Sequence, residues 1–278
     1  MKKKNKNIFC FVAGRSGGHI IPCLTIAQKL KNEDPSCYIL FISTNTKLDQ
    51  ELIKKSSFVD SHKFFAIDNV PKQIHKFPKF LFNVFLCFLK TFFFFIKNRP
   101  QKIISTGSYI SIPVCIAGRL LFIKTELYEL NATPGKTISF LAPFTHKINV
   151  CLEEAKTFFN KKKCSLTPYP MRFSEKHLSI TKKYAYKKLK LKPSLKTLFV
   201  VGGSQGSLFL NNLAIKLFEN YPDTKNKWQI IYQPKENEPN LYKSFYTKNK
   251  IFALELDKKH SIEYCYKAAD LIICRSGA

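Results

Sequence analysis

The fold is decided by the stretch Ile8-Phe9-Cys10-Phe11-Val12-Ala13-Gly14-Arg15-Ser16-Gly17-Gly18-His19. Its first five residues are apolar and mostly aromatic or β-branched, which indicates a buried strand. The glycines after them form a turn, and Pro22 suits the first turn of a following helix because its missing N–H is not needed there. A strand that passes through a glycine turn into a helix is the opening unit of a doubly wound α/β sheet.

The same pattern occurs again in the second half of the chain, where an apolar run over 198–201 enters a glycine-rich turn at 202–206 and then a helical pattern over 208–219. Elsewhere, short apolar runs alternate with helical patterns. Strands are predicted over residues 8–12, 37–43, 102–106, 124–129, 147–151, 197–201, 228–233, 250–255 and 270–274. The alternation is typical of parallel sheets with crossover helices, so the predicted fold class is α/β, with two Rossmann-like, doubly wound domains.

A polar, Lys-rich stretch separates the two series of strands. We therefore expect an N-terminal domain over 1–170, a linker over 171–196 and a C-terminal domain over 197–278. The sequence stops directly after the turn that follows the predicted strand 270–274, and a parallel strand needs a crossover helix to cover it. We expect the second domain to be incomplete.

The charge balance is strongly positive, since 46 Lys and Arg against 19 Asp and Glu give a net charge of +27. Such a surplus attracts polyanions of any kind. Only five of the 46 are Arg, whereas sequence-specific readers of nucleic acid rely on the Arg fork. An AT-rich coding bias accounts for the lysines equally well, so no specific nucleic-acid partner is expected.

The nine cysteines are odd in number, and no two have the spacing of a zinc knuckle. They indicate reduced, mostly buried thiols in a cytoplasmic protein, and no metal site is expected.

The Phe-rich segment 80–96 is apolar almost throughout. A transmembrane span is disfavoured, because the run falls just short of the ~18 to 20 residues required and because Lys90 lies near its middle. Two interpretations stay open: an ordinary crossover helix, and a helix whose second apolar face dips into an anionic membrane surface. Flanking lysines favour the second: Lys72, Lys76, Lys79 and Lys97.

The two glycine turns are candidate phosphate sites, because each leads into a helix N-terminus whose free N–H groups attract anions. Neither fits the dinucleotide or P-loop spacing. His19 lies at the mouth of the first turn, where it is either a functional group or a packed cap. One such turn per domain indicates a cleft in which two phosphate-bearing substrates meet, as in two-domain nucleotide-sugar glycosyltransferases.

Further motifs then occur in a recognisable order. They are the N-terminal glycine loop, Thr106-Gly107-Ser108-Tyr109 with Pro113, Glu129-Leu130-Asn131-Ala132-Thr133-Pro134-Gly135, Pro170-Met171-Arg172, the second glycine loop and Asp270 to Ala278. Together they resemble the bacterial lipid II-forming N-acetylglucosaminyltransferase family (MurG), over essentially the whole chain. The resemblance implies the GT-B glycosyltransferase architecture.

The resemblance also implies inverting, metal-independent transfer of N-acetylglucosamine from UDP-N-acetylglucosamine to lipid I, a polyprenyl diphosphate, in peptidoglycan biosynthesis. No cofactor is implied. The implied location is peripheral, on the cytoplasmic face of the bacterial inner membrane, which gives the Phe-rich helix a purpose.

Site residues are implied position by position. His19 is the catalytic base at the acceptor hydroxyl. Substrate contacts are expected from Ser16, Gly17, Gly18, Asn131, Arg172, Ser204 and Leu256. Supporting positions are Gly14, Glu129, Gly203, Gln205, Gly206 and Ala278. The sequence departs from the family where Arg15-Ser16 replaces the usual Gly-Thr.

Alternatives from other classes stay open. One is a catalytically silent, truncated remnant, another is a related GT-B glycosyltransferase with a different acceptor, and a third is a nucleic-acid binder that depends on net charge alone.

Overall fold

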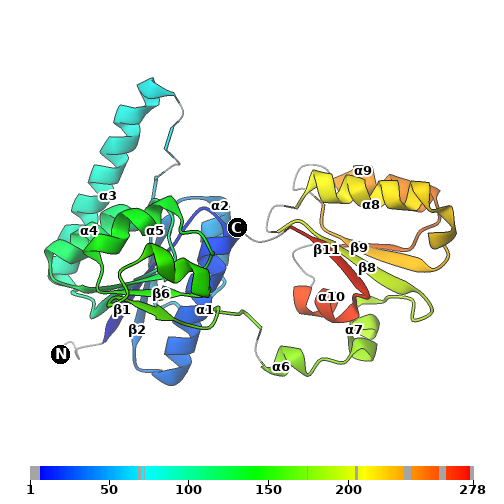
Figure 1. Cartoon of the computed structure of the whole chain (residues 1–278), viewed down its shortest axis with the longest axis horizontal. Coiled ribbons are helices and arrows are strands. Elements are labelled where there is room, and N and C mark those ends of the chain that lie inside the picture. The colour runs from blue at the N-terminus through cyan, green and yellow to red at the C-terminus, as the bar shows by residue number, and fades with distance from the viewer. Residues whose placement is uncertain are drawn as a thin grey trace. The chain divides into compact units, whose positions relative to one another are not determined.

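The computed structural model describes residues 7–67, 70–71, 73–173, 175–203, 206–234, 239–256 and 261–275. The chain divides into two compact units, residues 1–172 and 173–277. Each unit has its own parallel sheet, flanked by helices (Figure 1), so the predicted α/β class with two Rossmann-like domains is confirmed. The predictions for Lys72, Ser204, Gln205 and Ala278 lie outside the described residues.

The first unit is built on a seven-stranded sheet of order β3-β2-β1-β4-β5-β6-β7. Its strands are β1 (Ile8–Val12), β2 (Tyr38–Thr44), β3 (Ser61–Phe65), β4 (Lys102–Ser105), β5 (Lys124–Glu129), β6 (Lys147–Val150) and β7 (Cys164–Leu166). Its α-helices are α1 (Gly17–Glu33), α2 (Lys47–Lys54), α3 (Phe77–Lys97), α4 (Ser111–Leu120) and α5 (Lys136–Leu141). Short 3-10 turns are η1 (Ile74–Lys76), η2 (Ala142–Phe144) and η3 (Glu153–Phe158).

Alternation along the strands fills two cores, one on each face of this sheet. In β1, Cys10 and Val12 pack with α3, α4 and α5, whereas Phe11 packs with α1 and α2 on the opposite face. A strand that is apolar on both faces must be covered on both, and Figure 1 shows these helices on either side of the sheet.

The strand order reverses beside β1, which pairs with β2 on one side and with β4 on the other. Val12 is level with Ser105 of β4, so the turns after these two strands leave the sheet side by side. In doubly wound sheets this topological switch point at the carboxyl ends of the strands is where ligands bind.

The second unit has a four-stranded parallel sheet of order β10-β9-β8-β11. Its strands are β8 (Lys196–Val201), β9 (Trp228–Tyr232), β10 (Ala253–Glu255) and β11 (Leu271–Cys274). Its helical elements are α6 (Glu175–Leu178), α7 (Lys182–Leu189), α8 (Leu208–Asn220), η4 (Pro222–Thr224), α9 (Pro239–Lys248) and α10 (Ile262–Ala268). Here β8 lies at the switch point, between β9 and β11.

The segment predicted as a linker contains the helices α6 and α7. Ala185, Tyr186 and Leu189 of α7 are buried in the core that also covers Phe199 of β8. These three residues share one helix face, while the exposed lysines of α7 gave the segment its polar composition. Most of the segment is therefore part of the second unit.

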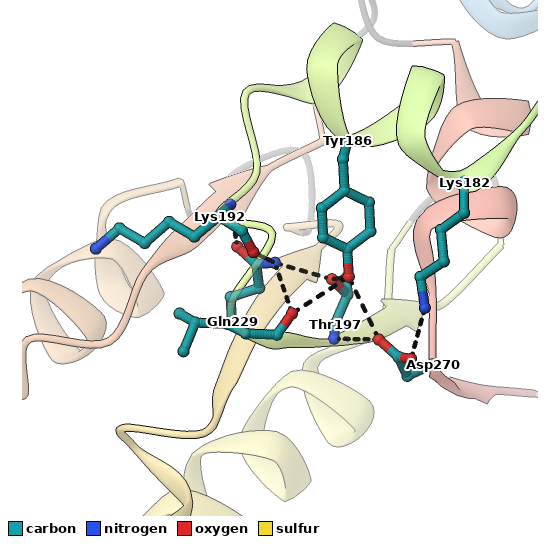
Figure 2. A network of polar contacts seen from close by, with 7 residues as sticks. Lys182, Tyr186, Lys192, Thr197, Gln229 and Asp270 are labelled. Atoms are coloured by element: carbon teal, nitrogen blue, oxygen red, sulfur yellow. Dashed lines mark hydrogen bonds and ion pairs between the residues drawn. The ribbon is translucent and has the colours of Figure 1, made fainter.

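A polar network closes the amino-terminal end of the second sheet (Figure 2). Asp270 accepts hydrogen bonds from the Thr197 backbone N–H at 2.7 Å and from Lys182 Nζ at 2.5 Å. The Tyr186 hydroxyl lies 2.8 Å from Thr197 Oγ1, to which Gln229 Nε2 donates at 3.0 Å. The network joins α7, β8 and β9 to Asp270, the residue before β11. A cavity of about 810 Å³ beside it lies at the opposite end of β8 from the glycine turn, away from the candidate site.

Candidate functional site

The first glycine turn connects β1 to α1 with an unusual backbone. Arg15 has a φ of 67°, a left-handed conformation that costs an L residue roughly 1–2 kcal/mol. Ser16 is the N-cap of α1, but its side chain makes no capping hydrogen bond. Within the described residues, the N–H groups of Ser16, Gly17 and Gly18 have no hydrogen-bond partner. The predicted contacts at these three positions therefore lie together, as donors suited to an anion.

His19 is the third residue of α1 and is half-buried. Its Nδ1 lies 2.9 Å from the carbonyl oxygen of Thr106, in the turn after β4, and the Thr106 hydroxyl donates back to the His19 carbonyl at 2.7 Å. Because a carbonyl oxygen only accepts, this bond assigns the proton to Nδ1 and leaves the Nε2 lone pair available. The ring is therefore arranged to accept a proton at Nε2.

Gly107 makes room for this ring. Its φ is 101°, and a Cβ at this position would lie 3.4 Å from His19 Cε1. Only glycine adopts that conformation without strain.

Two other ionisable groups near this turn stay protonated at neutral pH. Burial raises the pKa of Cys23, one helical turn after His19, to about 12. Burial, with a smaller contribution from Glu126, likewise raises the pKa of Tyr128 to about 12. Neither can serve as a base in the neutral range.

Asn131 follows β5 and is held by Glu129, which is buried at 2% exposure. Glu129 Oε1 accepts from the Asn131 backbone N–H at 2.9 Å and from Asn131 Nδ2 at 3.1 Å. Its other oxygen accepts from the Gly135 N–H at 2.9 Å, ahead of α5. The Asn131 amide oxygen thereby keeps its capacity to accept a hydrogen bond from a sugar hydroxyl.

The second glycine turn connects β8 to α8. Gly203 and Gly206 have φ values of 83° and 70°. A Cβ on Gly202 would lie 2.4 Å from the Ser207 backbone nitrogen, so no side chain fits there. Ser207 caps α8 by accepting from the Leu210 N–H at 3.4 Å. This tight turn brings backbone close to the start of α8, as a phosphate site requires.

Asn211, in the first turn of α8, joins this turn to the next strand. Its Nδ2 donates to the Gln233 carbonyl, just after β9, at 2.8 Å. Asn211 is 1% exposed, and its Oδ1 has no partner among the described residues. Leu256 lies at the end of β10, and its N–H donates to the Tyr232 carbonyl at 2.8 Å. Leu256 thus reaches the same edge of the sheet as Gly202, while Arg172 lies exposed at the end of the first unit.

Three residues that support the candidate site were not among the predicted site residues: Asp49, Thr106 and Asn211. Thr106 falls within a quoted motif, but only the fold reveals that its carbonyl holds His19. Asp49 and Asn211 carry no local signal beyond a polar residue in the first turn of a helix.

The helix α3 presents a large apolar surface. Phe82, Phe85 and Phe93 are 59%, 55% and 64% exposed, whereas Phe95 is fully buried against the sheet. The helical stretch Ile74–Lys97 has 24 residues, and an 18-residue window within it has a mean hydropathy of 1.8, enough in length and composition to cross a membrane. The prediction that this segment is too short to span a membrane is therefore wrong, because the helix extends beyond the apolar run. Lys90 remains exposed within the helix.

Comparison with known proteins shows the class of protein to which the chain belongs. Residues 9–150 match the N-terminal domain of glycosyltransferase family 28, and residues 197–278 match the C-terminal domain of that family. The chain belongs to glycosyltransferase family 28.

Several relatives within that class carry the name UDP-N-acetylglucosamine–N-acetylmuramyl-(pentapeptide) pyrophosphoryl-undecaprenol N-acetylglucosamine transferase. The protein from Halothermothrix orenii is 33% identical, over 96% of this chain and 73% of its own length. The protein from Borreliella burgdorferi is 30% identical, over 99% of this chain and 72% of its own. The resemblance predicted from the motifs is confirmed.

Solved structures show the same fold. MurG from Acinetobacter baumannii superposes with a TM-score of 0.66 at 20% identity, covering 98% of this chain and 74% of its own. UDP-GlcNAc 2-epimerase from Neisseria meningitidis, bound to UDP-GlcNAc, superposes with a TM-score of 0.67 at 12% identity, covering 97% and 78%.

Proposed function

We propose that this chain transfers N-acetylglucosamine from UDP-N-acetylglucosamine to lipid I, the undecaprenyl-diphosphate-linked muramyl pentapeptide, and so forms lipid II for peptidoglycan biosynthesis. The relatives named for this transfer are 30% and 33% identical to the chain over nearly all of it. The structural observation that carries the chemistry is the His19–Thr106 pair, which assigns the ring proton to Nδ1.

In the proposed reaction, His19 Nε2 removes the proton from the 4-hydroxyl of the muramyl sugar. That oxygen attacks the anomeric carbon of the donor sugar from the face opposite the leaving group. The bond from this carbon to the UDP oxygen breaks, and the configuration inverts. The proton passes from Nε2 to water. A base positioned in this way contributes about 10²- to 10⁴-fold to the rate.

The acceptor diphosphate is assigned to the start of α1, through Ser16, Gly17 and Gly18, and the donor to the second unit. Negative charge grows on the UDP diphosphate as it leaves, and preorganised N–H donors at the start of α8 stabilise it. Arg172 adds a positive charge, and the Asn131 amide contacts the donor sugar.

The acceptor's lipid places the enzyme at a membrane. We assign the exposed apolar face of α3, with Lys79, Lys90 and Lys97, to the cytoplasmic surface of the inner membrane. A helix that covers its own sheet with one face, and carries lysines beside a second apolar face, has the amphipathic character of a peripheral anchor.

The test is transfer of radiolabelled N-acetylglucosamine to a short-chain lipid I analogue. We expect turnover by the wild-type chain, and a loss of about 10²-fold or more in kcat for His19→Ala. His62→Ala, at an exposed position on β3, is the matched control and should leave kcat unchanged. Full activity of His19→Ala would reject His19 as the base, and a wild-type chain without turnover would favour a silent remnant.

A further inference from the structure

Asp49 is a fully buried carboxylate directly beneath the first glycine turn. It is the third residue of α2, whose N-cap is Thr46, and it is 0% exposed. A Cβ on Gly14 would lie 3.1 Å from Asp49 Oδ2. The carboxylate is therefore in contact with the turn, although it lies 34 residues from Arg15 in sequence.

Hydrogen-bond donors surround this carboxylate. The Arg15 backbone N–H lies 3.1 Å from both of its oxygens, and the Thr44 N–H lies 3.1 Å from Oδ2. The Thr46 hydroxyl donates at 2.6 Å, and the Thr44 hydroxyl also contacts Oδ2. The Ser43 hydroxyl lies 2.7 Å from Oδ2 and 2.5 Å from the Ala13 carbonyl oxygen, between which its one proton is shared. Such a set of bonds holds Asp49 rigidly and compensates for the loss of water around a buried charge.

Arg15 is the residue that needs this support. Its φ of 67° is strained for any residue with a side chain. Asp49 binds the Arg15 N–H in that conformation, and Arg15 Nη1 donates to the Ile67 carbonyl at 3.1 Å. These two contacts offset the strain from opposite ends of the residue.

We propose that Asp49 is a positioning residue for the lipid-linked diphosphate. By holding Arg15 in the left-handed conformation and engaging its N–H, Asp49 sets the direction in which Ser16, Gly17 and Gly18 present their N–H groups. The inference rests on the proposed function, because it assigns the acceptor diphosphate to those groups.

Charge alone predicts that replacing Asp49 has the opposite effect on the affinity for the diphosphate. A carboxylate under the turn repels a diphosphate, so neutralising it should tighten binding if electrostatics dominated. Positioning predicts that binding weakens when the carboxylate is replaced, since an amide presents donors where Asp49 now only accepts. The sign of the change therefore separates the two effects.

The experiment is a double-mutant cycle with Asp49→Asn and Arg15→Gly. Glycine adopts a positive φ without strain, so it removes the need for Asp49 at this point. We expect Asp49→Asn to raise the KM for the lipid I analogue about tenfold with Arg15 present, and about twofold with glycine at that position. The KM for UDP-N-acetylglucosamine should stay the same throughout.

A second readout does not need turnover: the affinity for farnesyl diphosphate, measured by calorimetry, should fall in parallel. If Asp49→Asn fails to fold, the comparison is made between Arg15→Ala and Arg15→Gly. The Arg15→Ala variant should then bind farnesyl diphosphate more weakly than the Arg15→Gly variant. The inference would be overturned if Asp49→Asn raised the acceptor KM equally with Arg15 and with glycine at position 15, or if it lowered that KM. Equal binding of farnesyl diphosphate by Arg15→Ala and Arg15→Gly would overturn it as well. A wild-type chain that binds farnesyl diphosphate but transfers no sugar would count against the proposed function instead.

Discussion

At the scale of single residues, the position of the candidate base His19 depends on a neighbouring glycine, Gly107. Gly107 combines a φ of 101° with a Cβ position 3.4 Å from the His19 ring. Because of this φ, Gly107→Ala should strain the turn that carries the Thr106 carbonyl and so disturb the bond that orients the ring. We expect kcat to fall at least tenfold and stability to fall by about 1–2 kcal/mol, measured by the transfer assay and urea unfolding.

Gly135→Ala is the matched control for this substitution. Gly135 has a φ of −65°, and a Cβ there would meet nothing within 4 Å. The control should keep its activity and stability. Loss of activity in Gly135→Ala, or full activity in Gly107→Ala, would contradict the proposed steric role.

Local chemistry allowed part of the site to be predicted. The glycine turns and His19 are visible in sequence because strand, glycine and helix start follow one another within about ten residues. The supports are different: Thr106 lies 87 residues from His19, and Asp49 lies 34 from Arg15. Their roles arise only when the sheet order brings β4 and α2 to the turn after β1. The contacts expected at Arg172 and Leu256 stay predictions.

At the scale of elements, periodicity identified the strands with apolar runs but missed β3 and β7. The strand β3 reads Ser-His-Lys-Phe-Phe, and β7 has only three residues. Both are edge strands of a parallel sheet, where burial is partial and the continuous apolar run of a central strand is not required. The helix α7 was hidden in the same way by its exposed lysines.

The helix α3 makes the clearest prediction for an element. Replacing Phe82, Phe85 and Phe93 together by Ser should reduce binding to vesicles that contain phosphatidylglycerol at least tenfold, because each side chain is more than half exposed and buries little in the fold. Vesicle sedimentation measures the binding, and thermal unfolding should show no loss of stability. Phe158→Ser, also exposed but on η3, is the control. Unchanged binding by the triple variant would rule out this face as the anchor.

The junction of α7, β8 and β11 predicts a dependence of stability on pH. Burial raises the pKa of Asp270, but the hydrogen bonds from Lys182 and Thr197 outweigh it, so its pKa in the folded chain lies below the ordinary value. Its contribution to stability is therefore fully present above the unfolded pKa of about 3.9, and is lost as the pH falls through the lower folded pKa.

Asp270→Asn should lower stability at pH 7 and flatten the decline in stability between about pH 5 and pH 3, as followed by urea unfolding. The exposed Asp223→Asn, in η4, should change neither. An Asp270→Asn chain with the wild-type pH profile would show that the network in Figure 2 contributes nothing at this group.

At the scale of the whole molecule, the proposed membrane binding has two components, charge and apolar burial, which salt should separate. The net charge of +27 attracts any polyanion, but this attraction weakens as ionic strength rises from about 0.05 to 0.5 M. Burial of the apolar face of α3 is not screened. Binding to single-stranded RNA should therefore disappear at high salt without sequence preference, while binding to phosphatidylglycerol vesicles falls to a plateau above zero. The triple Phe variant should lose that plateau and keep the salt-sensitive part. Vesicle binding that vanishes with salt as completely as RNA binding would mean that charge alone holds the chain at the membrane, and the surface of α3 would then need another role.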